Sequence, residues 1–159
     1  FNQPITLPNS LTHLTFGNHF NQPIILPNSL THLTFGTHFN QPVILPNNLI
    51  YLEFGENFNQ PIELPNTIEY LNFGDYFNQI VNVIDKHTGK TFKNLKLINF
   101  GYNFCSRLQI GIIEDKFKQV KICLNKEYFY KIFSIKEQYD FKNYIIYDND
   151  KIIMDNIVW

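Results

Sequence analysis

The sequence of 159 residues has no alanine, only two cysteines, and no N-x-Ser/Thr glycosylation signal. Two cysteines, Cys105 and Cys123, are too few for a disulfide framework in a domain of this size, so we expect buried free thiols. No apolar run approaches the roughly 18 residues of a membrane-spanning helix, and the N-terminus lacks the pattern of a signal peptide. These absences favour an intracellular protein that does not bind membranes.

Basic residues are absent from residues 1–79, whereas residues 80–159 contain all 13 Lys plus Arg of the chain. The first half holds five of the 14 acidic residues, so the two halves carry formal charges of −5 and +4. Such a dipolar chain does not favour nucleic acid as a partner. The apolar content of 44% is enough for one packed domain. The acidic residues of the first half are Glu53, Glu56, Glu63, Glu69 and Asp75.

Four units of equal length follow one another without a gap, beginning at Phe1, Phe20, Phe39 and Phe58. Self-similarity at a period of roughly 20 residues is typical of a solenoid, in which one coil cannot bury its apolar face alone. A fifth unit begins at Phe77, but the phenylalanine that would start the following unit is Phe104, so this unit is longer. We expect the additional residues, inserted near 82–91, to form a small projecting hairpin. Because the chain begins inside a unit, we expect it to be a fragment.

Each unit combines a strand pattern with a proline-rich segment. In Leu11-x-x-Leu14-x-Phe16, residues two apart point the same way, so Leu14 and Phe16 face inward while His13 and Thr15 face outward. Stacked units then build a parallel sheet. The segment FNQPI-x-LPN holds two prolines, which predict an irregular return path. The glycine after each strand indicates a positive φ or a tight turn.

Asparagine recurs at two positions of each unit. We expect these residues to form structural ladders of buried asparagine in two rows: Asn2, Asn21, Asn40, Asn59 and Asn78, and Asn9, Asn28, Asn47 and Asn66.

The sequence motifs FNQPI, LPNSLTHLTFG and LPNxLxxLxFG resemble the FNIP repeat, which is a relative of the leucine-rich repeat. The FNIP repeat is found in F-box/FNIP repeat-containing proteins of giant DNA viruses and social amoebae. The resemblance covers residues 1–104. It implies a mainly β, right-handed, leucine-rich-repeat-like solenoid with a parallel sheet on one face and irregular Pro-rich returns on the other. It also implies that this piece is the target-binding part of an F-box ubiquitin ligase adaptor, in the host cytoplasm if the source is viral. The chain itself contains no F-box.

The repeat pattern decays after Phe104. We therefore divide the chain into FNIP-like repeats at 1–104 and a part at 105–159 with degenerate last coils and a C-terminal cap. The segments 117–124 and 141–147 echo residues 92–100, so they are candidates for further coils.

Few residues suggest catalysis or the binding of a metal ion or phosphate. His13 and His32, like His19 and His38, occupy equivalent positions in adjacent units, but no carboxylate or thiolate accompanies them, so we expect no metal. The sequence at 88–91 has the GKT ending of a phosphate loop without the earlier glycine. We predict no catalytic residues and no cofactor.

The outward strand positions form the candidate binding surface. Tyrosine and histidine offer large amphipathic contact areas, and such residues often dominate interface energetics. We expect a protein target to bind there, centred on Tyr51 and Tyr70, although a tyrosine ladder that only stabilises strand pairing explains the same pattern. The alternative function is a structural or virion-associated assembly protein that self-associates through an open solenoid end. The predicted binding residues are His13, His32, Tyr51, Glu53, Tyr70, Asn72 and Leu97.

Overall fold

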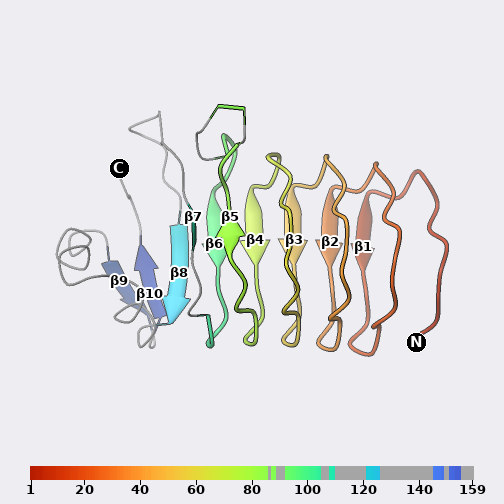
Figure 1. Ribbon diagram of the computed structural model, residues 1–159, viewed down its shortest axis with the longest axis horizontal. Coiled ribbons are helices and arrows are strands. Elements are labelled where there is room, and N and C mark those ends of the chain that lie inside the picture. Colours follow the sequence, from red (N-terminus) through yellow and green to blue (C-terminus); the bar gives the residue numbers. More distant parts are fainter. Residues whose placement is uncertain are drawn as a thin grey trace.

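The computed structural model describes residues 1–85, 87–88 and 92–104, and beyond them the backbone of four strands at 108–109, 121–125, 145–148 and 151–154. These residues form a β-solenoid, in which stacked coils each contribute one strand to a long sheet (Figure 1). No helix occurs in the described part of the chain. The predicted mainly β solenoid is therefore confirmed.

The main sheet has eight strands in the order β1-β2-β3-β4-β6-β8-β10-β9. Neighbours from β1 through β8 pair in parallel, whereas β10 pairs antiparallel with both β8 and β9. A second sheet consists of β5 and β7, which are parallel. The strands are β1 (His13–Thr15), β2 (His32–Thr34), β3 (Tyr51–Glu53), β4 (Tyr70–Asn72), β5 (Val81–Asn82), β6 (Leu97–Asn99), β7 (Leu108–Gln109), β8 (Lys121–Asn125), β9 (Ile145–Asp148) and β10 (Lys151–Met154).

Two tight turns shape each coil. Before the strand, the Leu30 N–H donates to the Pro27 carbonyl at 3.1 Å, and after it the Phe39 N–H donates to the Gly36 carbonyl at 3.3 Å. Equivalent bonds recur in the other coils. Between the turns the return segment is extended but unpaired in the first four coils, because its two prolines lack the N–H that a strand ladder requires.

The core consists of leucines from the strands and two rows of stacked phenylalanine rings. Leu33 and Leu52 are fully buried. Within one coil the Phe35 and Phe39 ring centroids lie 3.8 Å apart. Burial of each such side chain contributes roughly 1.5–3 kcal/mol, so coil stacking supplies most of the stability.

The two phenylalanine rows show that the rod curves. Between the second and third coils, the centroids of Phe35 and Phe54, in the row next to the strands, are 5.4 Å apart, whereas those of Phe39 and Phe58, in the row that starts the returns, are 6.0 Å apart. The return-side spacing is also the larger one in the other three pairs of complete coils. The coils therefore fan open toward the returns, and the strand side is the inner side of the curve.

One asparagine row joins the coils as predicted. Asn40 Oδ1 accepts the Asn59 N–H at 2.9 Å and the Gln60 side-chain amide at 3.1 Å, and this pattern repeats along the rod. The row is partly exposed rather than buried. The second row does not form a buried ladder, because Asn9, Asn28 and the equivalent residues lie exposed in the Pro-Asn turns.

Of the two reasons expected for the repeated glycines, a positive φ or a tight turn, the structure shows the tight turn and adds a third reason. They do open tight turns, but none has a φ in the left-handed region. A Cβ on Gly55 would lie 2.2 Å from the Gly36 carbonyl oxygen, and Gly36, Gly74 and Gly101 are equally confined by backbone. At Gly17, in the first coil, nothing lies within 4 Å of that position. Close approach of adjacent coils is therefore what excludes a side chain.

The return segment of the fifth coil contains a strand, unlike those of the first four coils. There Ile80 and Ile84 replace the two prolines, which restores backbone donors, and β5 forms between them. The Phe92 N–H donates to the Val83 carbonyl at 2.9 Å, and both side chains are buried. The base of the predicted hairpin is thus closed, while residues 86 and 89–91 lie outside the described residues.

Beyond the fifth coil the described strands change direction. Strand β8 continues the parallel sheet, as expected for the segment 117–124. Strand β9, which overlaps the segment 141–147, is antiparallel to its neighbour and therefore does not add another coil of the same sense. The remainder of the predicted cap lies outside the described residues, as does Cys105.

Candidate functional site

Strand register brings the predicted binding residues together in two outward rows. Leu33 pairs with Leu52 in the register of β2 and β3, and both point into the core, so the residues on either side must point outward. We call this surface the strand face. Its first row is His13, His32, Tyr51, Tyr70 and Leu97, and its second row is Thr15, Thr34, Glu53, Asn72 and Asn99.

Histidine rings cover the N-terminal part of the strand face. The His13 and His32 rings stack with centroids 4.3 Å apart and planes within 8°, and Tyr51 continues the stack at 6.0 Å from His32. The Thr31 hydroxyl donates to the Thr12 carbonyl at 3.0 Å and lies 2.9 Å from His32 Nδ1, so hydrogen bonding to the preceding residue helps to hold the His32 ring.

A hydrogen-bonded group occupies the middle of the strand face. The Tyr51 hydroxyl donates to Glu53 Oε2 at 2.7 Å and accepts from Asn72 Nδ2 at 3.3 Å. Burial, together with the bond to the Glu53 carboxylate, raises the pKa of Tyr51 above its usual value. Tyr51 thus joins β3 to β4 and has a structural role in addition to any contact with a partner.

Tyr70 is covered on one side by a cation from the fifth coil. Lys96 Nζ lies 5.3 Å from the Tyr70 ring centroid and 2.6 Å from Glu69 Oε2. The hydrogen bond to Glu69 is the main reason that the pKa of Lys96 is raised. Tyr70 remains 37% exposed, so it is accessible to a partner. The first row of the strand face therefore includes Tyr51, whose hydroxyl is hydrogen-bonded to neighbouring side chains, and Tyr70, which is more accessible.

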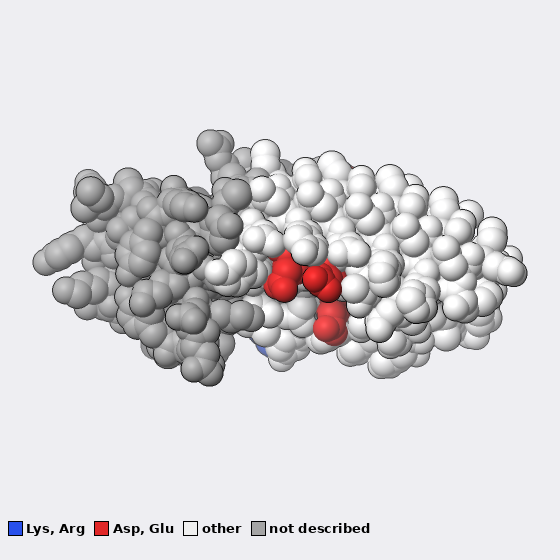
Figure 2. Space-filling model, turned by 90° about the horizontal axis from the view of Figure 1, so that it is seen from below, with Lys and Arg blue, Asp and Glu red and all other residues white. Residues whose placement is uncertain are grey.

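Acidic side chains gather beside the strand face near the middle of the rod (Figure 2). Glu56 and Asp75 occupy equivalent positions in the turns after β3 and β4, close in sequence to Glu53. Asp75 accepts the Tyr102 N–H at 3.0 Å, which helps to hold the next turn. In the described part of the chain, no three His, Cys, Asp or Glu side chains are placed to bind a metal ion. The described residues also contain no helix that could cross a membrane.

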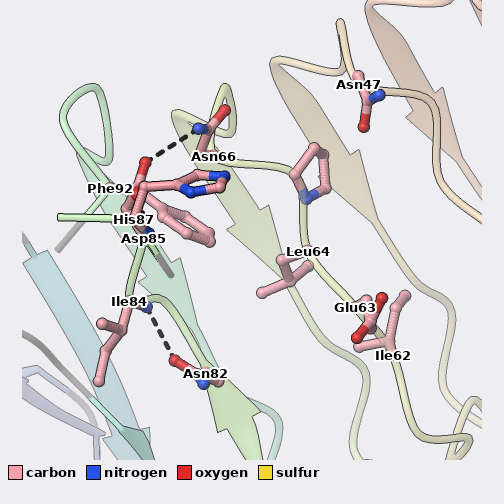
Figure 3. Close-up of a pocket in the computed structure, with 11 residues that line it drawn as sticks. Asn47, Ile62, Glu63, Leu64, Asn66, Asn82, Ile84, Asp85, His87 and Phe92 are labelled. Carbon is pink, nitrogen blue, oxygen red and sulfur yellow. Dashed lines mark hydrogen bonds between the residues drawn. The ribbon is translucent and has the colours of Figure 1, made fainter. Parts of the chain in front are cut away.

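A groove on the return side was not anticipated from the sequence (Figure 3). It has a volume of about 560 Å³ and lies between the return segments and the inserted segment of the fifth coil. Asp85 organises one wall by accepting the Asn66 amide at 3.1 Å and the N–H groups of His87 and Thr88. The Asn66 bond is the main cause of the lowered pKa of Asp85. The replacement of Asn by Asp at this repeat position was the available signal in the sequence.

Comparison with known proteins identifies the family to which the repeats belong. The model of the FNIP repeat matches residues 1–38, 39–76 and 58–84, which together cover more than half of the chain. The chain belongs to the FNIP repeat family. This FNIP chain is also similar to the crystal structure of CroV588, a circular LRR protein from a giant virus. The identity is 45% and the TM-score 0.55, over 70% of the FNIP chain and 19% of CroV588. No curated protein matches the chain.

Both comparisons agree with the leucine-rich-repeat-like architecture of the FNIP coils. The chain corresponds to about a fifth of the length of CroV588, so that structure bears on the coils rather than on a whole protein. Repeats of this kind serve as protein-interaction modules, because stacked coils present a long continuous surface. For the FNIP chain that surface includes the strand face.

Proposed function

We propose that this FNIP solenoid is a non-catalytic module that binds a partner protein on its strand face. The observation that carries the proposal is the register of β1 to β4, which places His13, His32, Tyr51 and Tyr70 in one row on the inner side of the curve. Concave surfaces of solenoids fit extended or convex partners. Aromatic residues at the centre of such a surface are the usual anchors of binding energy.

The side chains of the first row have fixed conformations, which supports this proposal. The His13 and His32 rings stack on each other, and the hydrogen bond of Tyr51 to Glu53 fixes its ring before any partner arrives. A partner then loses less free energy to side-chain ordering, which costs roughly 0.5–1.5 kcal/mol for each flexible side chain immobilised. The strand face is therefore preorganised for binding.

Tyr70 is the residue with which to test the proposal, because Tyr51 also holds the fold. We would capture partners from cells with this chain as bait, and then measure affinity for the captured partner by calorimetry. Tyr70→Ala is expected to weaken binding at least tenfold. The matched control is Tyr76→Ala, since Tyr76 is 52% exposed in a turn outside the strand face. Equal effects of the two substitutions, or a larger effect of the control, would exclude the strand face.

The adaptor role is a finer proposal, supported by the family resemblance. If the repeats select targets for a ubiquitin ligase, a full-length protein with this segment should co-purify with ligase core proteins, while the present chain should capture only the target. Co-purification of a target without any ligase component would argue against the adaptor role.

A further inference from the structure

The strand face and the turns that border it carry mostly negative charge. Residues 1–79 contain no Lys or Arg, and their five acidic residues all lie in the third and fourth coils, residues 39–76. One of the five, Glu63, lies in a return segment. The other four lie on the strand face or next to it, near the middle of the rod (Figure 2): Glu53, Glu56, Glu69 and Asp75.

The fold does not require negative charge in the bordering turns. Glu56 and Asp75 occupy the position that holds Asn18 in the first coil and Thr37 in the second. Their turns are directly stacked, since the Tyr76 N–H donates to the Glu56 carbonyl at 3.0 Å. Like charges at equivalent positions of neighbouring coils repel and therefore cost stability. A repeat that departs from its own pattern at a cost to the fold indicates a functional position.

The hydrogen bonds of these carboxylates leave their charge in place. Glu53 accepts from the Tyr51 hydroxyl, which is a neutral donor. Asp75 accepts from the Tyr102 N–H, which is also neutral. A glutamine or an asparagine would accept the same hydrogen bonds. In the described part of the chain, no Lys or Arg forms an ion pair with Glu53, Glu56 or Asp75, so these residues maintain a negative potential beside the strand face.

Lys96 shows how this surface holds a cation. Its Nζ lies 2.6 Å from Glu69 Oε2 and 5.3 Å from the centroid of the Tyr70 ring. A carboxylate and a tyrosine ring thus bind one ammonium group together, next to β4. Basic side chains of a partner suit the same combination, because ammonium and guanidinium groups pair with carboxylates and lie over aromatic rings.

We propose that the partner of the strand face presents a Lys- and Arg-rich segment to the third and fourth coils, attracted by Glu53, Glu56 and Asp75. This inference rests on the proposed function and names the chemistry of the partner. The first two coils contain no acidic residue, which places the basic segment over the middle of the rod. Charges at the rim of an interface act mainly on the rate of association and on orientation. They act over a screening length of about 8 Å at physiological salt, so Glu56 and Asp75 attract the segment without touching it.

A basic peptide tests the sign of the charge. The probe is a fluorescent dodecapeptide of alternating Arg and Ser, titrated with the complete chain and followed by fluorescence anisotropy. We expect binding that weakens roughly tenfold between about 20 and 150 mM salt, because salt screens exposed charges. Absence of binding at low salt, or an affinity that salt does not change, overturns the proposal.

Amide substitutions show where the probe binds, because they remove a charge and keep a hydrogen-bond acceptor. Glu56→Gln and Asp75→Asn should each lower the affinity for the probe about two- to fivefold. Lys96→Gln should raise the affinity, since Glu69 then loses its cation. The matched control is Glu63→Gln, which removes the same charge from a return segment and should leave the affinity unchanged. Equal losses in Glu56→Gln and Glu63→Gln, or a loss in Lys96→Gln, would contradict the assignment.

The captured partner separates this inference from the proposed function. Its association rate, measured by stopped-flow fluorescence, should fall as salt is raised and should be lower for Glu56→Gln than for the wild type at low salt. If Tyr70→Ala weakens binding while neither salt nor Glu56→Gln slows association, the strand face binds a partner without a basic segment, and this inference alone fails. If Tyr70→Ala has no effect, the proposed function fails with it.

Discussion

The glycine after each strand offers a sharp test of the coil packing. In Gly55→Ala, the new Cβ would stand 2.2 Å from the Gly36 carbonyl oxygen and 2.7 Å from the Thr37 nitrogen. An ordinary contact needs about 3.4 Å, so two backbone segments must separate by roughly 1 Å. Overpacking of this kind costs about 1–3 kcal/mol, and backbone cannot rotate away as a flexible side chain can.

Gly17→Ala is the matched control, because the same substitution meets no atom within 4 Å in the first coil. A glycine replaced without strain usually gains about 0.4–1 kcal/mol, since alanine restricts the unfolded chain. Urea titrations followed by far-ultraviolet circular dichroism would give both unfolding free energies. We expect Gly55→Ala to lose stability and Gly17→Ala to keep or gain it. Equal changes in the two variants would refute steric approach as the reason for the glycines.

Three further predictions concern the coil ladder and the strand face. Asn40→Ala removes the acceptor of the Asn59 N–H and should cost about 1–3 kcal/mol of unfolding free energy in urea titrations, whereas Asn28→Ala, in an exposed turn, should cost little. Because the pKa of Tyr51 is raised in the folded state, its contribution is complete below the ordinary tyrosine pKa of about 10 and is lost as pH rises through the raised value. Stability measured over roughly pH 8 to 11 should show a steeper alkaline loss for the wild type than for Tyr51→Phe. Lys96→Gln, at an exposed position, should leave stability unchanged yet alter the affinity of the captured partner, because it uncovers the Tyr70 ring.

The regular part of the fold follows from the sequence because each unit repeats both its apolar pattern and its turn residues. Leu14 and Phe16 fix which side of the strand is inward, and the constant spacing of the units fixes the register of His13 on His32. The proline-rich returns were likewise predictable, since proline lacks a donor wherever it stands.

Other features depend on distances that a sequence pattern does not contain. The need for Gly55 arises from the approach of a neighbouring coil, whereas the sequence pattern indicated only a positive φ or a tight turn. The groove depends on the hydrogen bond between Asn66 and Asp85, which lie in adjacent coils. The exposure of Ile25 depends on the path of the return segment. The difference between Tyr51 and Tyr70 also depends on contacts with Glu53, Asn72 and Lys96 that single positions do not reveal.

Hydroxyl-radical footprinting of the chain with and without its captured partner tests the central proposal most directly, because it reports the accessibility of individual side chains. At one fixed chain concentration, partner binding should protect His13, His32 and Tyr70 from oxidation. Ile25 and Ile44, on the return side, should be oxidised to the same extent in both samples. Protection of the isoleucines without protection of the strand face would contradict the assignment of the binding surface.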